Sequence, residues 1–195
     1  VYPMKVVLDT SSLLSLVRYY IPFDNEQVLF DYIKSKLHVG EIILIDKVFD
    51  ECKYISNKVI FKDLFFLEDK NFLQSSGIPY KTDSLLAPSP GKFLRRVDDH
   101  FAISVQKRKL TPVQYETEKN SYLNSADIKQ IILCLNLIEK REDVVLVTEE
   151  SRASNDSKIF KKLPAICDML GINSSTLPNL LLQSADIELK CLKRE

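Results

Sequence analysis

Acidic side chains stand at the ends of apolar segments in four separate parts of the chain. Asp9 follows the apolar run 6–8, Asp127 begins a long apolar helical pattern, and Glu51 lies beside the apolar stripe of a shorter helix. Carboxylates that share a crevice repel one another unless a cation is bound, and hard divalent ions prefer oxygen ligands. The pattern therefore indicates a site for Mg²⁺ or Mn²⁺. Its candidate ligands are Asp9, Glu51, Asp127, Glu150 and Asp156.

Each of these acids also has an ordinary structural explanation. Asp9 can cap the helix that follows it, and an acid in the first turn of a helix, as at Asp127, is favoured by the helix dipole alone. Glu51 can lay its stem along an apolar stripe. Glu150 and Asp156 belong to a polar loop, where acids are common. The metal-site hypothesis therefore depends on the acids converging and not on any one of them.

Short apolar runs without polar alternation predict strands that are buried on both faces of a parallel sheet. Such runs occupy residues 6–8, 41–45 and 144–148, and 172–177 is a candidate edge strand. Helical patterns separate the runs, as in βα units, and α/β proteins bind ligands at the carboxyl ends of their strands. We therefore predict an α/β fold with three layers, α/β/α, around a central, mostly parallel sheet. The acids that follow the strands should share one edge.

A strong helix and an irregular region fill much of the remaining chain. The strong helix begins after Asn124 or Ser125, carries Asp127 in its first turn and buries a stripe of Ile and Leu. The segment from about 61 to 123 is helical in composition but poorly punctuated, so we predict an insertion here within a single domain spanning residues 1–195. Inside it, one helical stripe is predicted from the spacing of Phe93, Val97, Phe101 and Val105.

Composition excludes several classes of protein. The 195 residues are 45% hydrophobic and 28% charged, as in an ordinary globular domain, and the formal net charge is zero. There is no long apolar run and no signal-peptide pattern, so we expect a cytoplasmic protein with no membrane partner. The four cysteines lack metal-ligand spacing, and His38 and His100 lie outside the acidic positions, which argues against zinc. No glycine-rich nucleotide-binding loop is present.

A polyanionic partner would need local basic groups, because the chain as a whole is neutral. One group follows the last predicted buried strand, and a second lies on the mid-chain helix at Lys92, Arg95 and Arg96. For each cation a solvated helix face is the ordinary alternative. The candidate RNA-binding residues of the first group are Arg152, Lys158, Lys161 and Lys162.

The order of these motifs resembles that of the PIN-domain nucleases. The likeness rests on Val-Leu-Asp-Thr-Ser at 7–11, the early helix with Glu51, Ala-Asp-Ile at 126–128, and Leu-Val-Thr-Glu-Glu at 146–150. The segment 159–172 is similar to the closing helix of a prokaryotic PIN subfamily. The resemblance implies an α/β/α protein that uses acids and Mg²⁺ or Mn²⁺ to hydrolyse single-stranded or structured RNA.

By position, the family's first to fourth acids match Asp9, Glu51, Asp127 and Glu150, and Ser11 matches the hydroxyl that orients the metal shell. The fourth position departs from the family pattern, because that acid is more often Asp and is usually followed by another acid two residues later. Asp156 is a candidate replacement.

Many prokaryotic PIN proteins are toxins, so the resemblance also implies an antitoxin protein as a partner, and the apolar mid-region suggests a homodimer. Two other functions stay open. The chain could be a catalytically silent PIN-like module that binds RNA or a protein. It could also be a phosphatase or phosphoacceptor with Asp9 as nucleophile, although Thr10 and Ser11 do not supply the second acid that such a site needs.

Overall fold

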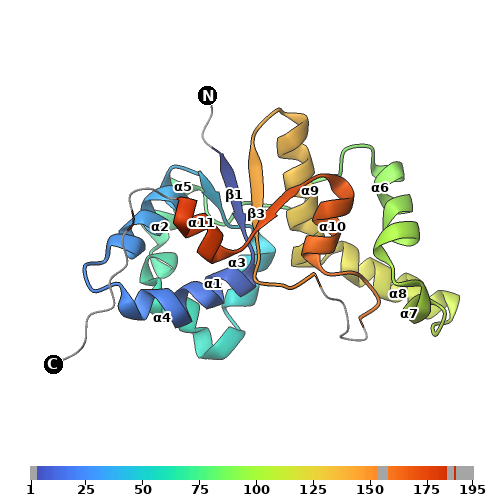
Figure 1. The fold of residues 1–195 in the computed structure, drawn as a ribbon, viewed down its shortest axis with the longest axis horizontal. Coiled ribbons are helices and arrows are strands. Elements are labelled where there is room, and N and C mark those ends of the chain that lie inside the picture. The colour runs from blue at the N-terminus through green and yellow to red at the C-terminus, as the bar shows by residue number, and fades with distance from the viewer. Residues whose placement is uncertain (1–3, 153–157, 184–186, 188–195) are drawn as a thin grey trace.

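An all-parallel sheet forms the centre of the computed structural model, which describes residues 4–152, 158–183 and 187. Its four strands lie in the order β2-β1-β3-β4, and Figure 1 shows β1 beside β3 at the centre. Val7 of β1 is paired with Ile43 on one side and with Leu146 on the other. The strands are β1 (Lys5–Leu8), β2 (Ile42–Ile43), β3 (Val144–Val147) and β4 (Asn173–Ser175).

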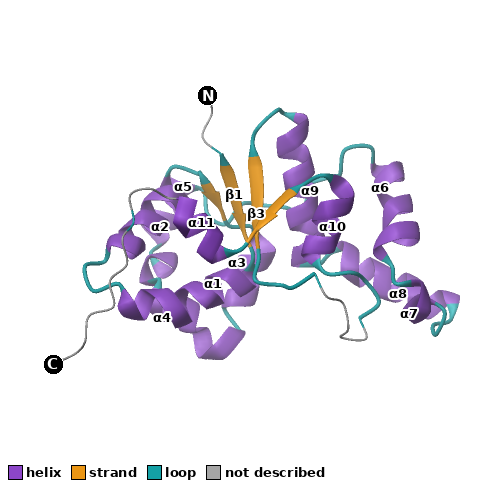
Figure 2. Ribbon diagram, viewed as in Figure 1, coloured by secondary structure: helices purple, strands orange, loops and turns teal. Residues whose placement is uncertain are grey.

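Helices surround the strands, as Figure 2 shows. The amino-terminal part contains α1 (Thr10–Ser15), α2 (Val28–His38), α3 (Asp46–Cys52) and α4 (Val59–Asp63), with the short helical turns η1 (Leu16–Tyr20), η2 (Ile21–Phe23), η3 (Ile55–Lys58) and η4 (Phe65–Glu68). The rest contains α5 (Lys70–Ser76), α6 (Pro90–Arg96), η5 (Val97–Phe101), α7 (Ser104–Lys107), α8 (Pro112–Leu123), α9 (Ala126–Glu139), α10 (Leu163–Leu170) and α11 (Leu177–Gln183). None of the helices in the described ranges is long and apolar enough to cross a membrane.

The strand order determines which face each connection covers. The chain moves from β1 to β2 in one direction and from β3 to β4 in the other. Because crossovers between parallel strands are right-handed, α1 and α2 belong to one face of the sheet and α9 and α10 to the other. The fold is therefore α/β, consistent with three α/β/α layers, as the sequence predicts. Its topological switch point lies between β1 and β3, where open α/β sheets bind ligands.

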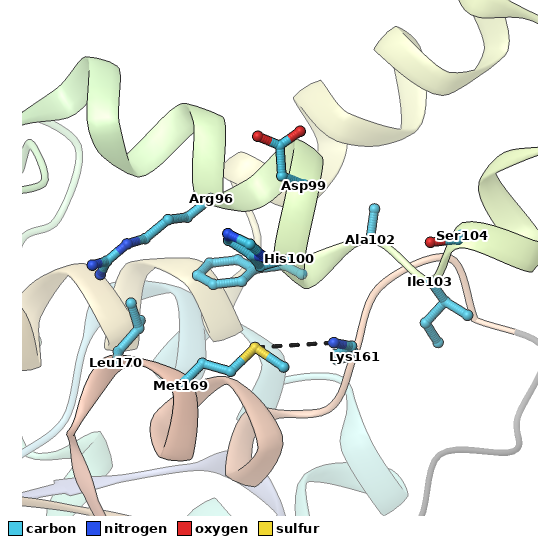
Figure 3. Close-up of a pocket in the computed structure, with 10 residues that line it drawn as sticks. Arg96, Asp99, His100, Ala102, Ile103, Ser104, Lys161, Met169 and Leu170 are labelled. Atoms are coloured by element: carbon cyan, nitrogen blue, oxygen red, sulfur yellow. Dashed lines mark hydrogen bonds between the residues drawn. The ribbon is translucent and has the colours of Figure 1, made fainter.

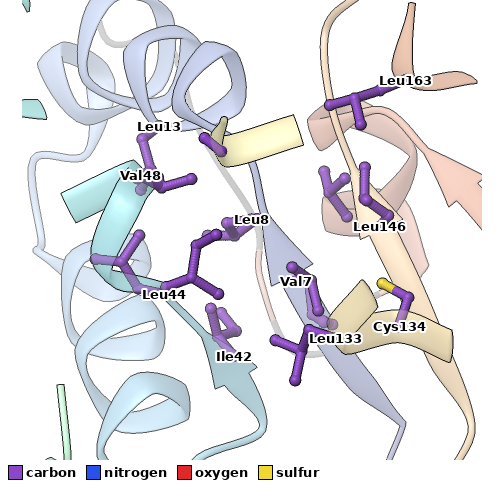
Figure 4. Close-up of a cluster of buried hydrophobic side chains, with 14 of the residues drawn as sticks. Val7, Leu8, Leu13, Ile42, Leu44, Val48, Leu133, Cys134, Leu146 and Leu163 are labelled. Carbon is purple, nitrogen blue, oxygen red and sulfur yellow. The ribbon is translucent and has the colours of Figure 1, made fainter. Parts of the chain in front are cut away.

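The core lies on both faces of β1 and β3, and Figure 4 shows its central side chains. Val7, Leu8 and Leu146 are at most 1% exposed, which explains why these strands lack polar alternation. Leu13 and Val48 pack from α1 and α3, and Leu133 packs from α9. Burial of these apolar surfaces holds the carboxyl ends of β1 and β3 next to each other.

The mid-chain helix differs from the prediction of one stripe from Phe93 to Val105. Phe93, Val97 and Phe101 are buried as predicted, but Val105 is 64% exposed. The helix stops because Ala102 takes an extended conformation and forms an antiparallel bridge with Phe160. The amide of Ile103 donates to the carbonyl of Ile159 at 2.8 Å. A tertiary pairing therefore overrides the helical spacing.

Two predicted strands are shorter than their apolar runs. The run 41–45 gives only Ile42–Ile43, because Ile45 leaves β2 and bridges to Tyr80 instead. The edge strand predicted at 172–177 is Asn173–Ser175, and α11 begins at Leu177. Both changes leave the order of elements as predicted.

Candidate active site

Asp9 stands at the carboxyl end of β1 and is 7% exposed. It is the N-cap residue of α1, and its Oδ2 accepts from the Ser11 hydroxyl at 2.6 Å and from the Thr148 hydroxyl at 3.0 Å. Its Oδ1 accepts a long bond, 3.4 Å, from Nε2 of Gln130. Capping therefore accounts for one oxygen of Asp9 and leaves the other facing α9.

Ser11 links the ends of β1 and β3. Its hydroxyl donates to Asp9 and also accepts from the backbone amide of Glu149 at 2.9 Å. The Thr148 hydroxyl lies 3.2 Å away from it. A single side chain thus fixes the orientation of Asp9 and holds the loop that follows β3.

Glu51 reaches the same region from α3. Its Oε2 accepts from the hydroxyl of Thr10 at 2.5 Å, so it lies next to the first residue of α1. Although much of the Glu51 residue is exposed, the pKa of its carboxyl group is raised, first by burial of the carboxyl end and then by the charge of Asp9, while the hydrogen bond from Thr10 opposes the rise. Glu51 is therefore a neighbour of Asp9 and is more than an exposed surface acid.

Asp127 occupies the first turn of α9, which Ser125 caps through the amide of Ile128. An acid here is favoured by the helix dipole, yet its pKa is raised to about 7. Burial is the largest cause, followed by the charges of Asp9, Glu150 and Glu51, while Lys158 opposes them. The environment of Asp127 therefore contains the other three predicted acids, and their charges act in the same direction as burial.

Glu149 and Glu150 have different partners after β3. Glu149 accepts from the amide of Leu177 at 2.6 Å and so holds the start of α11. Glu150 accepts from the amide of Leu163 at 3.1 Å, at the start of α10, and lies 3.8 Å from Nζ of Lys158. Of these two acids, Glu150 is the one that raises the pKa of Asp127.

The structure therefore brings together the acids that the sequence predicts at Asp9, Glu51, Asp127 and Glu150. They come from β1, α3, α9 and the loop after β3, at the switch point of the sheet. The remaining candidate, Asp156, lies outside the described residues.

A cavity of about 400 Å³ opens beside Asp127, between α8 and the segment that precedes α10. Three of the predicted RNA-binding residues line it: Lys158, Lys161 and Lys162. Tyr122 and Phe160 also line it, stacked with their ring centroids 3.9 Å apart. A polyanion could therefore meet positive charge immediately beside the acids, which lowers the cost of bringing phosphate to a negative site.

The fourth predicted cation has a different setting. Nε of Arg152 lies 3.1 Å from Oδ2 of Asp168, and both residues are exposed. A smaller cavity of about 240 Å³, lined in part by Thr148, Glu150 and Arg152, lies beside this pair. Arg152 is thus near the acids but on the side of β4 and not in the cavity beside Asp127.

Three polar residues of the site are absent from the candidates chosen from the sequence. Thr10 and Thr148 lie at the carboxyl ends of predicted strands, and this position in the sequence indicates that they belong to the site. Gln130 follows Asp127 by one helical turn and therefore shares its face. The Gln130 side chain is fully buried, and with Nε2 on Asp9 its Oε1 has no hydrogen-bond partner among the described residues.

The donor set fits a hard divalent cation. All four acids supply oxygen, a buried amide oxygen lies beside them, and the charges of neighbouring acids add to burial in raising the pKa of both Asp127 and Glu51. Within the described ranges, no three His, Cys, Asp or Glu side chains are arranged so that they could hold a metal ion as they stand. Glu51 and Glu150 instead accept hydrogen bonds from within the protein.

Comparisons of the chain with protein-family models, with curated proteins and with solved structures find no match.

Proposed function

We propose that this chain is a metal-dependent endoribonuclease of the PIN type, which uses Mg²⁺ or Mn²⁺ to hydrolyse phosphodiester bonds. One observation carries the proposal: four acids from distant parts of the sequence meet at the switch point of a parallel sheet, where burial first, and then the charges of the other three acids, raise the pKa of Asp127 to about 7. A group of acids with too little positive charge nearby is what a bound cation would neutralise. The order of the four acids along the chain supports the PIN type.

The residues that would hold the ion are Asp9, Glu51, Asp127 and Glu150. When bound, Mg²⁺ or Mn²⁺ supplies the Lewis acidity that activates water and offsets the charge that develops on a phosphate. Ser11 and Thr148 position Asp9 through two hydrogen bonds to one carboxylate oxygen, which leaves the other oxygen available. Binding would exchange the present hydrogen bonds of Glu51 and Glu150 for contacts with the ion.

Three lysines would bind the phosphates of the RNA substrate. Lys158, Lys161 and Lys162 line the cavity beside Asp127, so the strand should reach the acids through it. Phosphate contacts of this kind position a nucleic acid without reading its sequence.

The proposal is tested by incubating a fluorescently labelled single-stranded RNA with the purified protein and Mn²⁺. Asp9→Asn and Asp127→Asn each remove a ligand charge and should lower the cleavage rate by about 100-fold or more. Asp31→Asn is the matched control, since Asp31 is an exposed acid in the first turn of α2. Its rate should equal that of the parent.

Metal binding is measured separately from cleavage. At ~100 times its dissociation constant, Mn²⁺ should stabilise the parent by about 2.7 kcal/mol, and it should stabilise the Asp9→Asn protein much less. If the parent cuts no RNA and gains no stability from Mn²⁺ or Mg²⁺, the nuclease proposal is wrong. A protein that binds RNA or a protein partner without either effect would be the catalytically silent module instead.

The resemblance extends the proposal to the biological setting. We propose a toxin that acts on RNA in the cytoplasm and is neutralised by an antitoxin protein. Coexpression with the product of the adjacent gene tests this part, because an antitoxin should copurify with the protein and suppress its Mn²⁺-dependent cleavage.

A further inference from the structure

A second cavity, of about 510 Å³, lies on the far side of the segment 158–162 from the acids. It is enclosed by the end of α6, by η5 with the extended residues after it, and by the end of α10. Figure 3 shows Arg96, His100 and Lys161 around it, with Met169 and Leu170 on the α10 side. The volume is in the range of sites that hold a small ligand.

The lining combines positive charge with apolar surface. Arg96 and Lys161 are both partly buried, and His100 adds a ring that can stack on a base. Asp99 is the one acid in the lining. Within the part of the chain that the structure describes, Arg96 forms no ion pair with an acid. Its guanidinium is therefore available to an anion, whereas Arg152 is already occupied by Asp168.

The apolar part of the cavity suits a flat ring. Met169 and Leu170 form its apolar wall, and the Phe101 side chain beside the cavity is fully buried. Met169 is 44% exposed, so this apolar surface is open to an incoming group. Nucleobases pack well against such walls, and an Arg or Lys at the rim can bind the phosphate of the same nucleotide.

Lys161 connects this cavity to the candidate active site, because it lines both cavities. The connection is held by backbone pairing. The Lys161 amide donates to the carbonyl of Phe101 at 2.9 Å, and Ala102 is bridged to Phe160. The two cavities are thus neighbours across one extended segment, so a chain of phosphates can pass from one to the other over Lys161.

We propose that the cavity at Arg96 and His100 binds one nucleotide of a single-stranded RNA, a short distance along the strand from the bond that is cut. The inference rests on the proposed function and specifies its substrate: an RNA with an unpaired stretch that extends across Lys161. A duplex is excluded, because a base must leave the stack to enter the cavity.

The test compares two arginines. Arg96→Gln removes the charge that lines the cavity, whereas Arg108→Gln removes an exposed charge, just after α7, that does not line it. The probe is a labelled oligouridylate of about ten nucleotides, and its binding is followed by fluorescence anisotropy in EDTA, where no cleavage should occur. Arg96→Gln should weaken binding about 3- to 10-fold and lower the salt dependence by about one phosphate contact. Arg108→Gln should stay within about 2-fold of the parent.

Each outcome is decisive once urea unfolding shows that the two variants are as stable as the parent. A specific loss in Arg96→Gln, absent with a duplex of the same length, supports the cavity. Equal losses in both variants, or none in Arg96→Gln, overturn it. Cleavage by the parent in Mn²⁺ is measured separately. If the parent cleaves RNA but Arg96→Gln binds it normally, only the cavity proposal is overturned; if the parent does not cleave RNA, the nuclease proposal fails and the cavity no longer specifies its substrate.

Discussion

Replacing Asp127 by Asn should stabilise the metal-free protein at neutral and higher pH. The pKa of Asp127 is raised from 3.8 to about 7 by burial and by the surrounding acids. In the unfolded chain the group ionises near its ordinary value, so between these two pH values the folded protein holds a proton that the unfolded chain has released. The free energy of unfolding therefore falls as the pH rises through this window, and the full penalty is present above it.

The size of the effect follows from the shift. Three pKa units at ~1.4 kcal/mol each correspond to about 4 kcal/mol as an upper limit. Asp127 is partly exposed, and neighbouring acids can take up protons in its place, so we expect about 1–3 kcal/mol. The Asp127→Asn protein cannot ionise at this position and should keep this amount of stability at about pH 8.

The assay is urea unfolding in EDTA at about pH 5 and about pH 8, on the parent, Asp127→Asn and the control Asp31→Asn. The parent and the control should lose similar stability between the two pH values, and Asp127→Asn should lose clearly less. If Asp127→Asn loses as much as the parent, or is the less stable protein at the higher pH, the acids do not repel one another as argued.

Three further predictions concern single hydrogen bonds and can be measured by urea unfolding. The hydroxyl of Tyr122 is buried without a partner among the described residues, whereas that of Tyr115 donates to Asp98 at 2.9 Å. Tyr122→Phe should therefore be neutral or slightly stabilising, while Tyr115→Phe should cost about 1–2 kcal/mol; the opposite order would contradict this. Ser11→Ala leaves the amide of Glu149 without its acceptor and should lower the free energy of unfolding by about 1–2 kcal/mol. The same change should reduce the stabilisation of the protein by Mn²⁺. If that stabilisation is unchanged, Ser11 does not position Asp9. The hydroxyl of Thr82 donates to Oδ1 of Asp46 at 2.5 Å in the protein interior. Thr82→Val removes this hydrogen bond and should lower the free energy of unfolding by about 2–3 kcal/mol. A decrease of less than about 0.5 kcal/mol would show that the bond does not stabilise the fold.

Three of the four candidate acids can be chosen from the sequence because each stands at a boundary between elements, whereas Glu51 is chosen from its place beside the apolar stripe of a helix. Asp9 and Glu150 follow runs that have no polar alternation, and such runs are the clearest strand signal in this chain. Asp127 begins the most regular helix. Once a parallel sheet is assumed, these boundaries fall on one edge, so convergence can be predicted without knowing any distance.

The second cavity could not be predicted, because it depends on a pairing between distant segments. Phe93, Val97 and Phe101 keep their helical spacing, and nothing in the neighbouring residues signals the stop at Ala102. The partner, Phe160, comes much later in the chain. The position of Thr148 at the end of β3 can be predicted from the sequence. The hydrogen bond from its hydroxyl to Asp9 cannot, because it depends on the register between β1 and β3.

The central place of β1 also has a consequence for biosynthesis. β1 and β2 are both synthesised well before β3, the other neighbour of β1, which begins at Val144. A nascent chain can pair β1 with β2 alone, so one edge of an apolar strand stays open until late, when it is vulnerable to association with other chains. The same delay separates Asp9 from Asp127 and Glu150. A nascent chain that has not yet been extended to Asp127 therefore lacks two of the four acids of the candidate site.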